Sequence, residues 1–165
     1  MKPNWTKISI AAEIISSVAI VITLIYLSIQ TQQNTEALLA NTRNQIIDSD
    51  TAITQTLIED PSIELNFYRN EPLNDIERVK LENWLIALVR TREYQWLQYK
   101  NNVLDQQTWD AFLSAIAVTL SFPRTRAWWD AVSIEYFDDD FVMELNNYLK
   151  NFPIIENYKS PIEGL

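Results

Sequence analysis

Hydrophobic positions are concentrated in one uninterrupted stretch near the N-terminus and then recur at helical spacing along the rest of the chain. Residues 8–29 carry a single charge, that of Glu13, and contain neither proline nor glycine. At 1.5 Å per residue a helix of this length spans about 33 Å, enough to cross a hydrocarbon core of about 30 Å. The pattern predicts a membrane-spanning helix, with Trp5 and Tyr26 placed where aromatic side chains meet the headgroups.

Two other interpretations of this stretch remain open. A cleaved signal peptide has an apolar region of roughly 7–15 residues followed by small residues at a cleavage site. Here the run is longer and leads into Ser28 and Gln30. The buried helix of a soluble core suits apolar runs of roughly 10–14 residues. The length of the run favours the membrane span over both.

The same helix is expected to continue beyond the membrane as a stalk. Neither proline nor glycine occurs between Asn4 and Asp60, so no residue forces the helix to end at the headgroups. Apolar residues then recur at helical spacing among Asn, Gln, Thr and Asp: Leu38, Leu39, Ile46, Ile47, Ile53, Leu57 and Ile58. This stripe predicts that one face of the stalk packs against a partner surface.

Shorter helices are predicted after Pro61, which ends the stalk. The first covers residues 62–68. Asn74 followed by Glu77 has the pattern of a capping box and starts a helix that continues to about residue 102. The apolar positions of this helix should form the centre of the domain: Ile76, Val79, Leu81, Trp84, Leu85, Leu88, Val89, Trp96 and Leu97.

Three further helix starts follow from local chemistry. Asp105 is an expected N-cap for a helix up to residue 121, and Pro123 suits the first turn of the next helix, where its missing N–H is not needed. Asp138 and the two aspartates after it should open a last helix that ends near Lys150. Calcium binding is the other interpretation of these aspartates, but the loop of alternating Asp and Asn with a central glycine is missing.

The expected fold is all-α: a membrane helix continues into a long stalk helix and is followed by a small bundle of about four to five helices. The one glycine, Gly164, lies near the C-terminus, so hairpins of the Asn-Gly type are excluded. The expected division is a tail and membrane helix (1–34), a soluble helical domain that includes the stalk (35–152) and an extended C-terminal tail (153–165).

Composition and charge narrow the function. The 165 residues carry a net charge of −9, which disfavours a nucleic-acid partner because phosphates are neutralised by clustered Lys and Arg. The chain has no cysteine and no histidine. It therefore cannot form disulfides and has no thiol nucleophile, no imidazole base and none of the usual zinc or haem ligand sets. We expect a protein that is not an enzyme and that uses no cofactor or metal.

The first candidate site lies within the membrane stretch. An ionisable group such as Glu13 is costly there and is a functional candidate by default. Small and polar residues surround it at three- and four-residue steps and form what we call the small-residue face: Ser9, Ala12, Glu13, Ser16, Ala19 and Thr23. Such a face suits close contact between membrane helices. Glu13 is interpreted as part of this helix interface, and the alternative is a residue on an ion path.

The second candidate site is an arginine–tryptophan cluster on two of the soluble helices: Arg90, Glu93, Arg124, Arg126, Trp128 and Trp129. Arg90 and Glu93 are one helical turn apart, so they can form a partly buried ion pair that an arginine after Pro123 joins. Guanidinium groups stack on indoles and bind carboxylates with two hydrogen bonds. The cluster is therefore expected to tie helices together, and an anionic-ligand site is the alternative.

Several short motifs resemble a known family. They are AEI at 12–14, VITLIYL at 21–27, QQNT at 32–35, Glu93 with QY at 98–99, LD at 104–105 before Trp109, and RAWW at 126–129. Together they cover nearly the whole chain and are similar to the motifs of a widespread family of small bacterial single-pass membrane proteins of unknown function. The resemblance implies a location in the bacterial inner membrane and carries no activity with it.

Two arguments on the orientation of the chain disagree. Lys2 and Lys7 precede the membrane stretch, whereas Arg43 is the one basic residue within about 15 residues after it, so the positive-inside rule places the N-terminus in the cytoplasm. The family resembled usually carries basic residues after its anchor, where this chain has Thr31 and Gln32. That resemblance implies a cytoplasmic soluble domain, which is the orientation we expect.

The sequence thus predicts a membrane-anchored helical scaffold or interaction module. Its partners are the lipid bilayer and either further copies of the chain or another protein. The small-residue face, the continuous stalk and the missing catalytic groups support this function. The alternative is an oligomeric ion-conducting protein in which Glu13 faces the pore.

Overall fold

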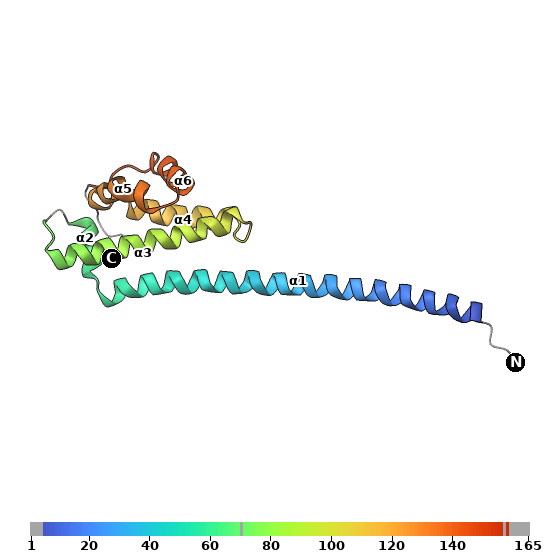
Figure 1. Ribbon diagram of the computed structural model, residues 1–165. Coiled ribbons are helices and arrows are strands. Elements are labelled where there is room, and N and C mark those ends of the chain that lie inside the picture. The colour runs from blue at the N-terminus through green and yellow to red at the C-terminus, as the bar shows by residue number, and fades with distance from the viewer. Residues whose placement is uncertain (1–4, 70, 157, 159–165) are drawn as a thin grey trace, which may run out of the picture. The chain divides into compact units, whose positions relative to one another are not determined.

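The computed structural model describes residues 5–69, 71–156 and 158, and it contains helices and no strand over these residues. The predicted all-α fold, with a long first helix and a small bundle after it, is confirmed. Figure 1 shows the order of the helices. They are α1 (Trp5–Glu59), α2 (Ser62–Tyr68), α3 (Asp75–Lys100), α4 (Gln106–Thr119), α5 (Pro123–Tyr136) and α6 (Asp139–Leu149).

Internal contacts divide the chain into two units, Met1–Asn44 and Gln45–Leu165. The described part of the first unit is entirely α1, and almost all of its side chains are exposed. Within the described residues, α1 is the one helix long and apolar enough to cross a membrane, and none of its apolar stretch is buried. A core helix of a soluble protein would be largely covered, so the exposure favours a membrane span over a core helix.

The helices of the second unit begin where local chemistry predicts. The Asn74 side chain accepts a hydrogen bond from the Glu77 N–H at 2.9 Å, and the Glu77 carboxylate accepts from the Asn74 N–H at 2.9 Å. Asp105 and Asp138 cap α4 and α6, and Pro123 is the first residue of α5. These assignments confirm the predicted capping box, both aspartate caps and the proline position.

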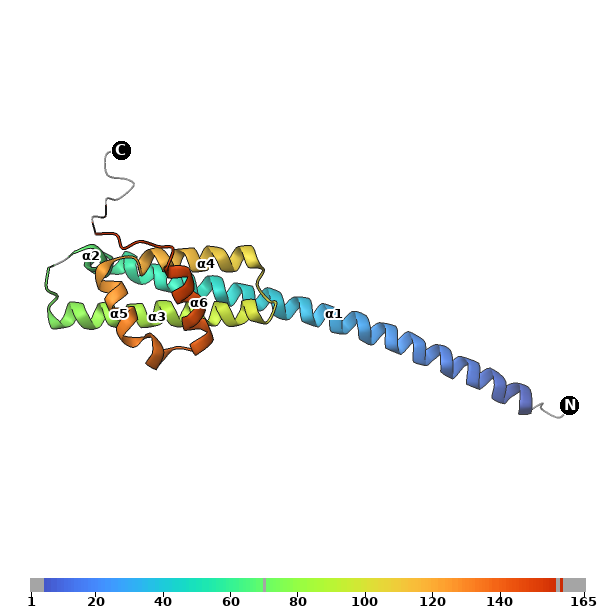
Figure 2. The ribbon, with the colours of Figure 1, turned by 90° about the horizontal axis from the view of Figure 1, so that it is seen from above.

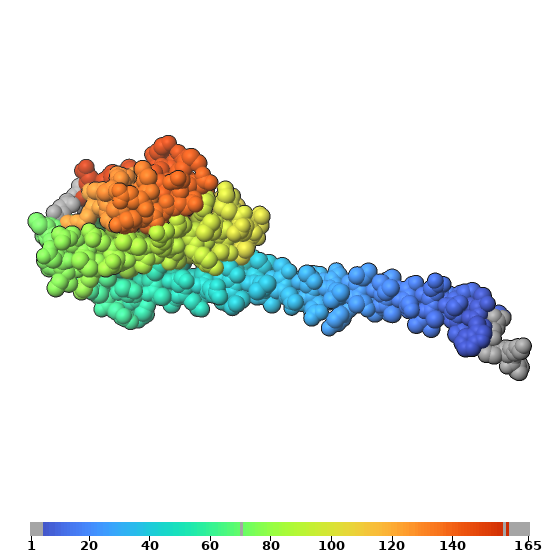
Figure 3. Space-filling model, in the orientation of Figure 1, coloured from blue at the N-terminus to red at the C-terminus, as the bar shows by residue number. Residues whose placement is uncertain are grey.

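The second unit has three layers. The helices α3 and α4 lie side by side, with α5 and α6 on one face and residues 45–59 of α1 on the other (Figures 1 and 2). In the space-filling view, the atoms of α5 and α6 lie directly on those of α3 (Figure 3). The largest fully buried side chains are Trp109, Trp129, Phe141, Leu85 and Ile116. One apolar core therefore joins all the layers.

The structure places some predicted core residues at the surface. Ile76 and Val79, in the first turns of α3, are 70% and 50% exposed, because continuous burial along this helix starts only at Leu81. The stripe on α1 also divides into two rows. Ile53 and Leu57 pack against the core, whereas Ile47 and Ile58 are 62% and 66% exposed. The stalk thus has one covered apolar row and one open apolar row.

The segment after α6 returns to the core. The N–H of Ile155 donates to the Ser121 carbonyl at 2.8 Å, and Phe152 and Ile155 pack against the core. The start of the predicted C-terminal tail is therefore held by the bundle. Tyr158 also stacks on Tyr68, with 4.3 Å between the ring centres. The other residues of the tail after Glu156, including Pro161 and Gly164, lie outside the described residues, as does the start of the predicted N-terminal tail.

Three indole N–H groups bind polar side chains of α6. Trp96 of α3 and Trp109 of α4 donate to the two carboxylate oxygens of Glu144, at 2.9 and 2.7 Å. Trp129 of α5 donates to the Asn146 side-chain oxygen at 2.8 Å. Buried donors are costly to leave unpaired, so these bonds fix the position of α6 against the other three helices.

Replacing Glu144 by alanine should lower the free energy of unfolding by about 2 kcal/mol, because two buried indole N–H groups lose their acceptor while water can still reach the half-buried site. Glu144→Gln should cost about half as much, since one amide oxygen remains to accept. Urea denaturation of the full chain in detergent, followed by circular dichroism, measures both changes. Equal losses for the two variants would contradict the two-acceptor arrangement.

Candidate functional site

The small-residue face lies along the described part of the first unit. All six residues, Ser9, Ala12, Glu13, Ser16, Ala19 and Thr23, are exposed on α1. The Ser9 hydroxyl donates to the Thr6 carbonyl at 3.1 Å, and the Thr23 hydroxyl donates to the Ala19 carbonyl at 2.8 Å. Because these hydroxyls are paired within the helix, they are compatible with an apolar surrounding. Small side chains on this face leave room for the backbone of a second helix.

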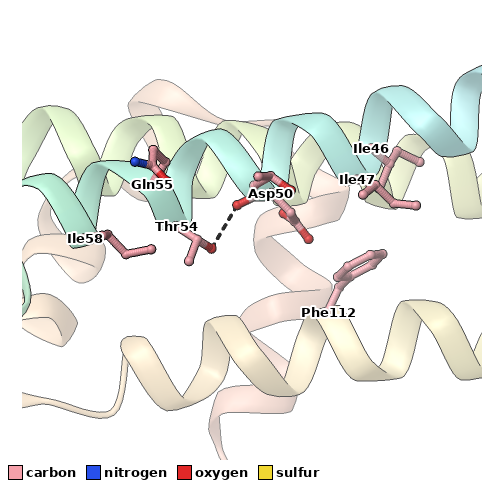
Figure 4. A pocket seen from close by; sticks show the side chains of 8 residues that line it. Ile46, Ile47, Asp50, Thr54, Gln55, Ile58 and Phe112 are labelled. Atoms are coloured by element: carbon pink, nitrogen blue, oxygen red, sulfur yellow. Dashed lines mark hydrogen bonds between the residues drawn. The ribbon is translucent and has the colours of Figure 1, made fainter.

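An open groove runs beside α1 in the second unit. Its volume is about 340 Å³, and α1 and Phe112 of α4 line it. Figure 4 shows Ile47, Thr54 and Ile58 on the side of α1 toward which Phe112 points. The Thr54 hydroxyl donates to the Asp50 carbonyl at 2.9 Å, so this polar group is already paired. The surface of the groove is therefore mainly apolar, and the Thr54 hydroxyl needs no further partner there.

A buried polar network lies between α1 and α3. Arg92 Nη1 is 2.5 Å from Asp50 Oδ1 and 2.8 Å from Gln95 Oε1. Gln95 Nε2 donates to the same Asp50 oxygen at 3.1 Å. The Arg92 guanidinium also lies 5.2 Å from the centre of the Phe112 ring. Asp50 of α1 is thus bonded to two side chains of α3.

This network was not among the predicted sites. Arg92 is only 8% exposed and Gln95 is fully buried, so removing the Asp50 carboxylate would leave charged and polar groups unpaired. The signal in the sequence is positional: Asp50 falls among Ile46, Ile53 and Leu57 on the stripe that becomes buried. This partly buried ion pair favours one register of α1 against α3, because a shifted helix loses it.

The predicted pair of Arg90 and Glu93 is present and has further partners. Arg90 Nη1 is 2.7 Å from Glu93 Oε2, and the guanidinium lies 4.8 Å from the centre of the Phe137 ring. The other Glu93 oxygen accepts a hydrogen bond from the backbone N–H of Asp138 at 2.6 Å. Glu93 therefore connects α3 to the residue that caps α6.

Arg124 and Arg126 do not join that pair and instead donate to backbone carbonyls. Arg124 donates to the Asn66 carbonyl at 2.5 Å and to the Glu71 carbonyl at 2.6 Å. Arg126 Nε donates to the Leu120 carbonyl at 2.7 Å. The arginine–tryptophan cluster is therefore not one site: its arginines bind at separate places, where they hold loops and helix ends.

The two neighbouring tryptophans of the cluster differ in burial. Trp129 is fully buried and packs at 5.6 Å, between ring centres, against Phe137. Trp128 is only partly buried, and with Arg124 it lines a pocket of about 360 Å³ whose other wall includes Leu81 and Leu85 of α3. One tryptophan belongs to the core and the other to the surface of the bundle.

An ion pair secures the end of α1. Asp60 accepts hydrogen bonds from Lys80 Nζ at 2.6 Å and from the Ser62 hydroxyl at 2.5 Å. Lys80, and then Ser62, lower the pKa of the Asp60 carboxyl below its ordinary value. Because the folded-state pKa is the lower one, the stabilisation is present above the ordinary pKa and is lost as the pH falls through the lowered value.

The substitution Lys80→Gln should raise the pKa of Asp60 toward its ordinary value, because the charged donor is removed. Titration of the carboxyl ¹³C resonance of Asp60 measures the change. Lys150→Gln is the matched control, since Lys150 is bonded to Asn147 instead. An Asp60 pKa that is identical in the parent and in Lys80→Gln would show that Lys80 does not set it.

Metal ligands do not cluster: no group of three or more His, Cys, Asp or Glu side chains is placed to hold an ion within the described ranges. The Asp138 carboxylate instead accepts from the N–H groups of Asp140 and Phe141, as a helix cap does.

Comparisons with protein-family models, curated proteins and solved structures give no match to this chain.

Proposed function

We propose that this chain is a single-pass membrane protein whose helical unit is an interaction module that assembles with further copies of itself. The observation that carries the proposal is the open apolar row on α1. Ile47 and Ile58 are 62% and 66% exposed and line a groove, although a neighbouring row of the same helix, with Ile53 and Leu57, packs against the core. Large apolar side chains that remain exposed beside a groove favour a site for a partner.

The exposed apolar stretch at the start of α1 supports the membrane location. It is long enough to cross a bilayer, and no described segment covers it. From the resemblance to small bacterial membrane proteins we place the chain in the inner membrane with the second unit in the cytoplasm. A shared membrane restricts copies to two dimensions, which raises their effective concentration.

The experiment that tests self-assembly is the mass of the purified chain in nanodiscs, measured over a range of protein loading. A mass of two or more chains is expected. Replacing Ile47 and Ile58 together by serine should weaken the assembly, whereas Ile76 and Ile134, which are also exposed, serve as matched control positions. A single-chain mass at all loadings would overturn the proposal.

Orientation is tested with single cysteines, for which the chain is suited because it has none of its own. In intact spheroplasts, a membrane-impermeant maleimide should label Asn4→Cys and leave Glu135→Cys unlabelled until the cells are lysed. Glu135 is exposed on α5, so lack of labelling cannot come from burial. Labelling of Glu135→Cys in intact spheroplasts would instead place the second unit outside.

A further inference from the structure

We propose that the partner of the open row on α1 is the α1 helix of a second copy, aligned in parallel and in register as a two-stranded coiled coil. This inference rests on the proposed function and specifies its interface. The occupant of the groove beside α1 is then another copy of this chain, and its place is set by the spacing of residues along the helix.

The open row has the spacing of a coiled coil. Steps of alternately four and three residues back from Ile58 reach Thr54, Thr51, Ile47, Asn44 and Ala40. All six side chains, which we call the heptad row, are exposed, and none is charged. A row with a 3.5-residue repeat lies on one side of a supercoiled helix and meets the same row of a partner. The heptad row is therefore a continuous candidate interface.

The same repeat extends into the membrane stretch. Continued toward the N-terminus, it passes through Ala37, Gln33, Gln30 and Tyr26 and then coincides with the five uncharged members of the small-residue face. Every step falls within α1, which is one uninterrupted helix from Trp5 to Glu59. No position of the repeat carries a charge, although α1 contains both acidic and basic side chains. Two sets of residues chosen by different criteria thus share one register.

The polar members of the heptad row favour a parallel pair. Asn44 occupies an a position if Ile47 is taken as d, and an asparagine at a single a position specifies the register and the two-stranded state of parallel coiled coils. The Thr54 hydroxyl is already bonded to the Asp50 carbonyl at 2.9 Å. Thr54 therefore adds no unpaired donor to the interface.

Charges beside the heptad row are complementary between parallel copies. In such a pair, the g position of one helix lies next to the e position five residues further along its partner. Arg43 is at g, and the residue five positions on is Asp48, which is at e. Both side chains are exposed and have opposite charges. In an antiparallel pair g positions face g positions and e positions face e positions, so Arg43 and Asp48 would not meet.

The interface does not compete with the fold of the second unit. The side of α1 that packs on the bundle carries Ile46, Ile53 and Leu57, none of which belongs to the heptad row. Phe112 of α4 borders the row on one side and lines the groove with Ile47 and Ile58 (Figure 4). A second α1 therefore has an open approach and additional apolar surface at Phe112.

Cysteine cross-linking in membranes tests the alignment, because the parent chain contains no cysteine. Oxidation should convert Ala40→Cys and Thr51→Cys into disulfide-linked dimers. Ser49→Cys, an exposed position on the other side of the same helix, is the matched control and should remain at least about tenfold less cross-linked. Same-residue cross-links at both Ala40 and Thr51 are possible only for parallel copies in register.

Charge reversal tests the pairing of Arg43 with Asp48. Arg43→Asp and Asp48→Arg should each weaken self-association in nanodiscs, by about fivefold for the two symmetric pairs of the dimer. The double variant should restore the affinity of the parent. Failure of the double variant to recover, with both single variants weakened, would show that the two residues do not meet across the interface.

The outcomes separate this inference from the function on which it rests. A dimeric mass combined with efficient cross-linking at Ser49 and none at Thr51 overturns the α1 alignment and leaves self-assembly intact. A single-chain mass with no cross-link at any position overturns both. A dimeric mass with cross-links at Ala40 and Thr51 alone supports both.

Discussion

Replacing Trp129 by alanine is expected to lower the free energy of unfolding by about 4 kcal/mol, the largest effect we foresee for one side chain. Trp129 is fully buried, packs on Phe137 and Phe141, and donates its indole N–H to Asn146 of α6. Its removal leaves a large cavity and breaks the hydrogen bond that joins α5 to α6. Urea denaturation of the full chain in detergent measures the loss.

The neighbouring residue is the matched control. Trp128 has the same side chain and lies on the same helix, but it is only partly buried and borders a surface pocket. Trp128→Ala should therefore cost about 1.5 kcal/mol, which reflects the smaller apolar area that it covers. Similar losses for the two variants would mean that the core does not centre on Trp129.

Much of the fold could be predicted because it is encoded locally. Asn74, Asp105 and Asp138 each mark a helix start through a hydrogen bond to a backbone N–H two or three residues away. Such bonds depend on neighbours in the sequence, so the capping residue alone identifies them. The length of α1 is likewise a local property, since no residue from Trp5 to Glu59 is a proline or glycine.

Contacts between distant residues could not be predicted in the same way. Arg124 donates to the carbonyls of Asn66 and Glu71. Every residue has a backbone carbonyl, so the sequence does not show which one accepts the bond. The sequence therefore predicts a carboxylate partner for Arg124, and this prediction is wrong. The division of the apolar stripe of α1 could not be predicted either. The sequence predicts one stripe, whereas the structure has a covered row and an open row.

The sequence contains a signal for the network around Asp50. A carboxylate at a position that repeats with Ile46, Ile53 and Leu57 requires a buried partner of opposite charge. Arg92 falls on the apolar face of α3 with Leu88 and is the basic residue that meets this need. The position of Asp50 and Arg92 on apolar helix faces therefore predicts their ion pair, which their opposite charges alone would not.

The open and covered rows of α1 have different consequences for its function. The covered row and Asp50 fix residues 45–59 of α1 on the bundle, so Ile47, Thr51, Thr54 and Ile58 are presented in one defined orientation. A loosely attached α1 would offer the same residues in many orientations and would lose more entropy on pairing. The proposed dimer therefore depends on the Asp50 network, although no residue of that network belongs to the heptad row.

Removing the Asp50 carboxylate is accordingly the second large effect that we expect. Asp50→Ala should lower the free energy of unfolding by about 3 kcal/mol, because Arg92 is left as a buried charge and Gln95 loses an acceptor. Asp130→Ala, an exposed substitution of the same kind on α5, should change it by less than about 0.5 kcal/mol. Urea denaturation in detergent compares the two variants.

The double variant Asp50→Ala with Arg92→Met distinguishes an unpaired charge from lost packing. If the buried charge causes the instability of Asp50→Ala, removing Arg92 as well should recover most of it, to within about 1 kcal/mol of the parent. If packing is the cause, the double variant should be less stable than either single one. Cross-linking of Thr51→Cys in the same backgrounds then shows whether the network orients the heptad row, because Asp50→Ala should reduce the cross-linked fraction and Asp130→Ala should not.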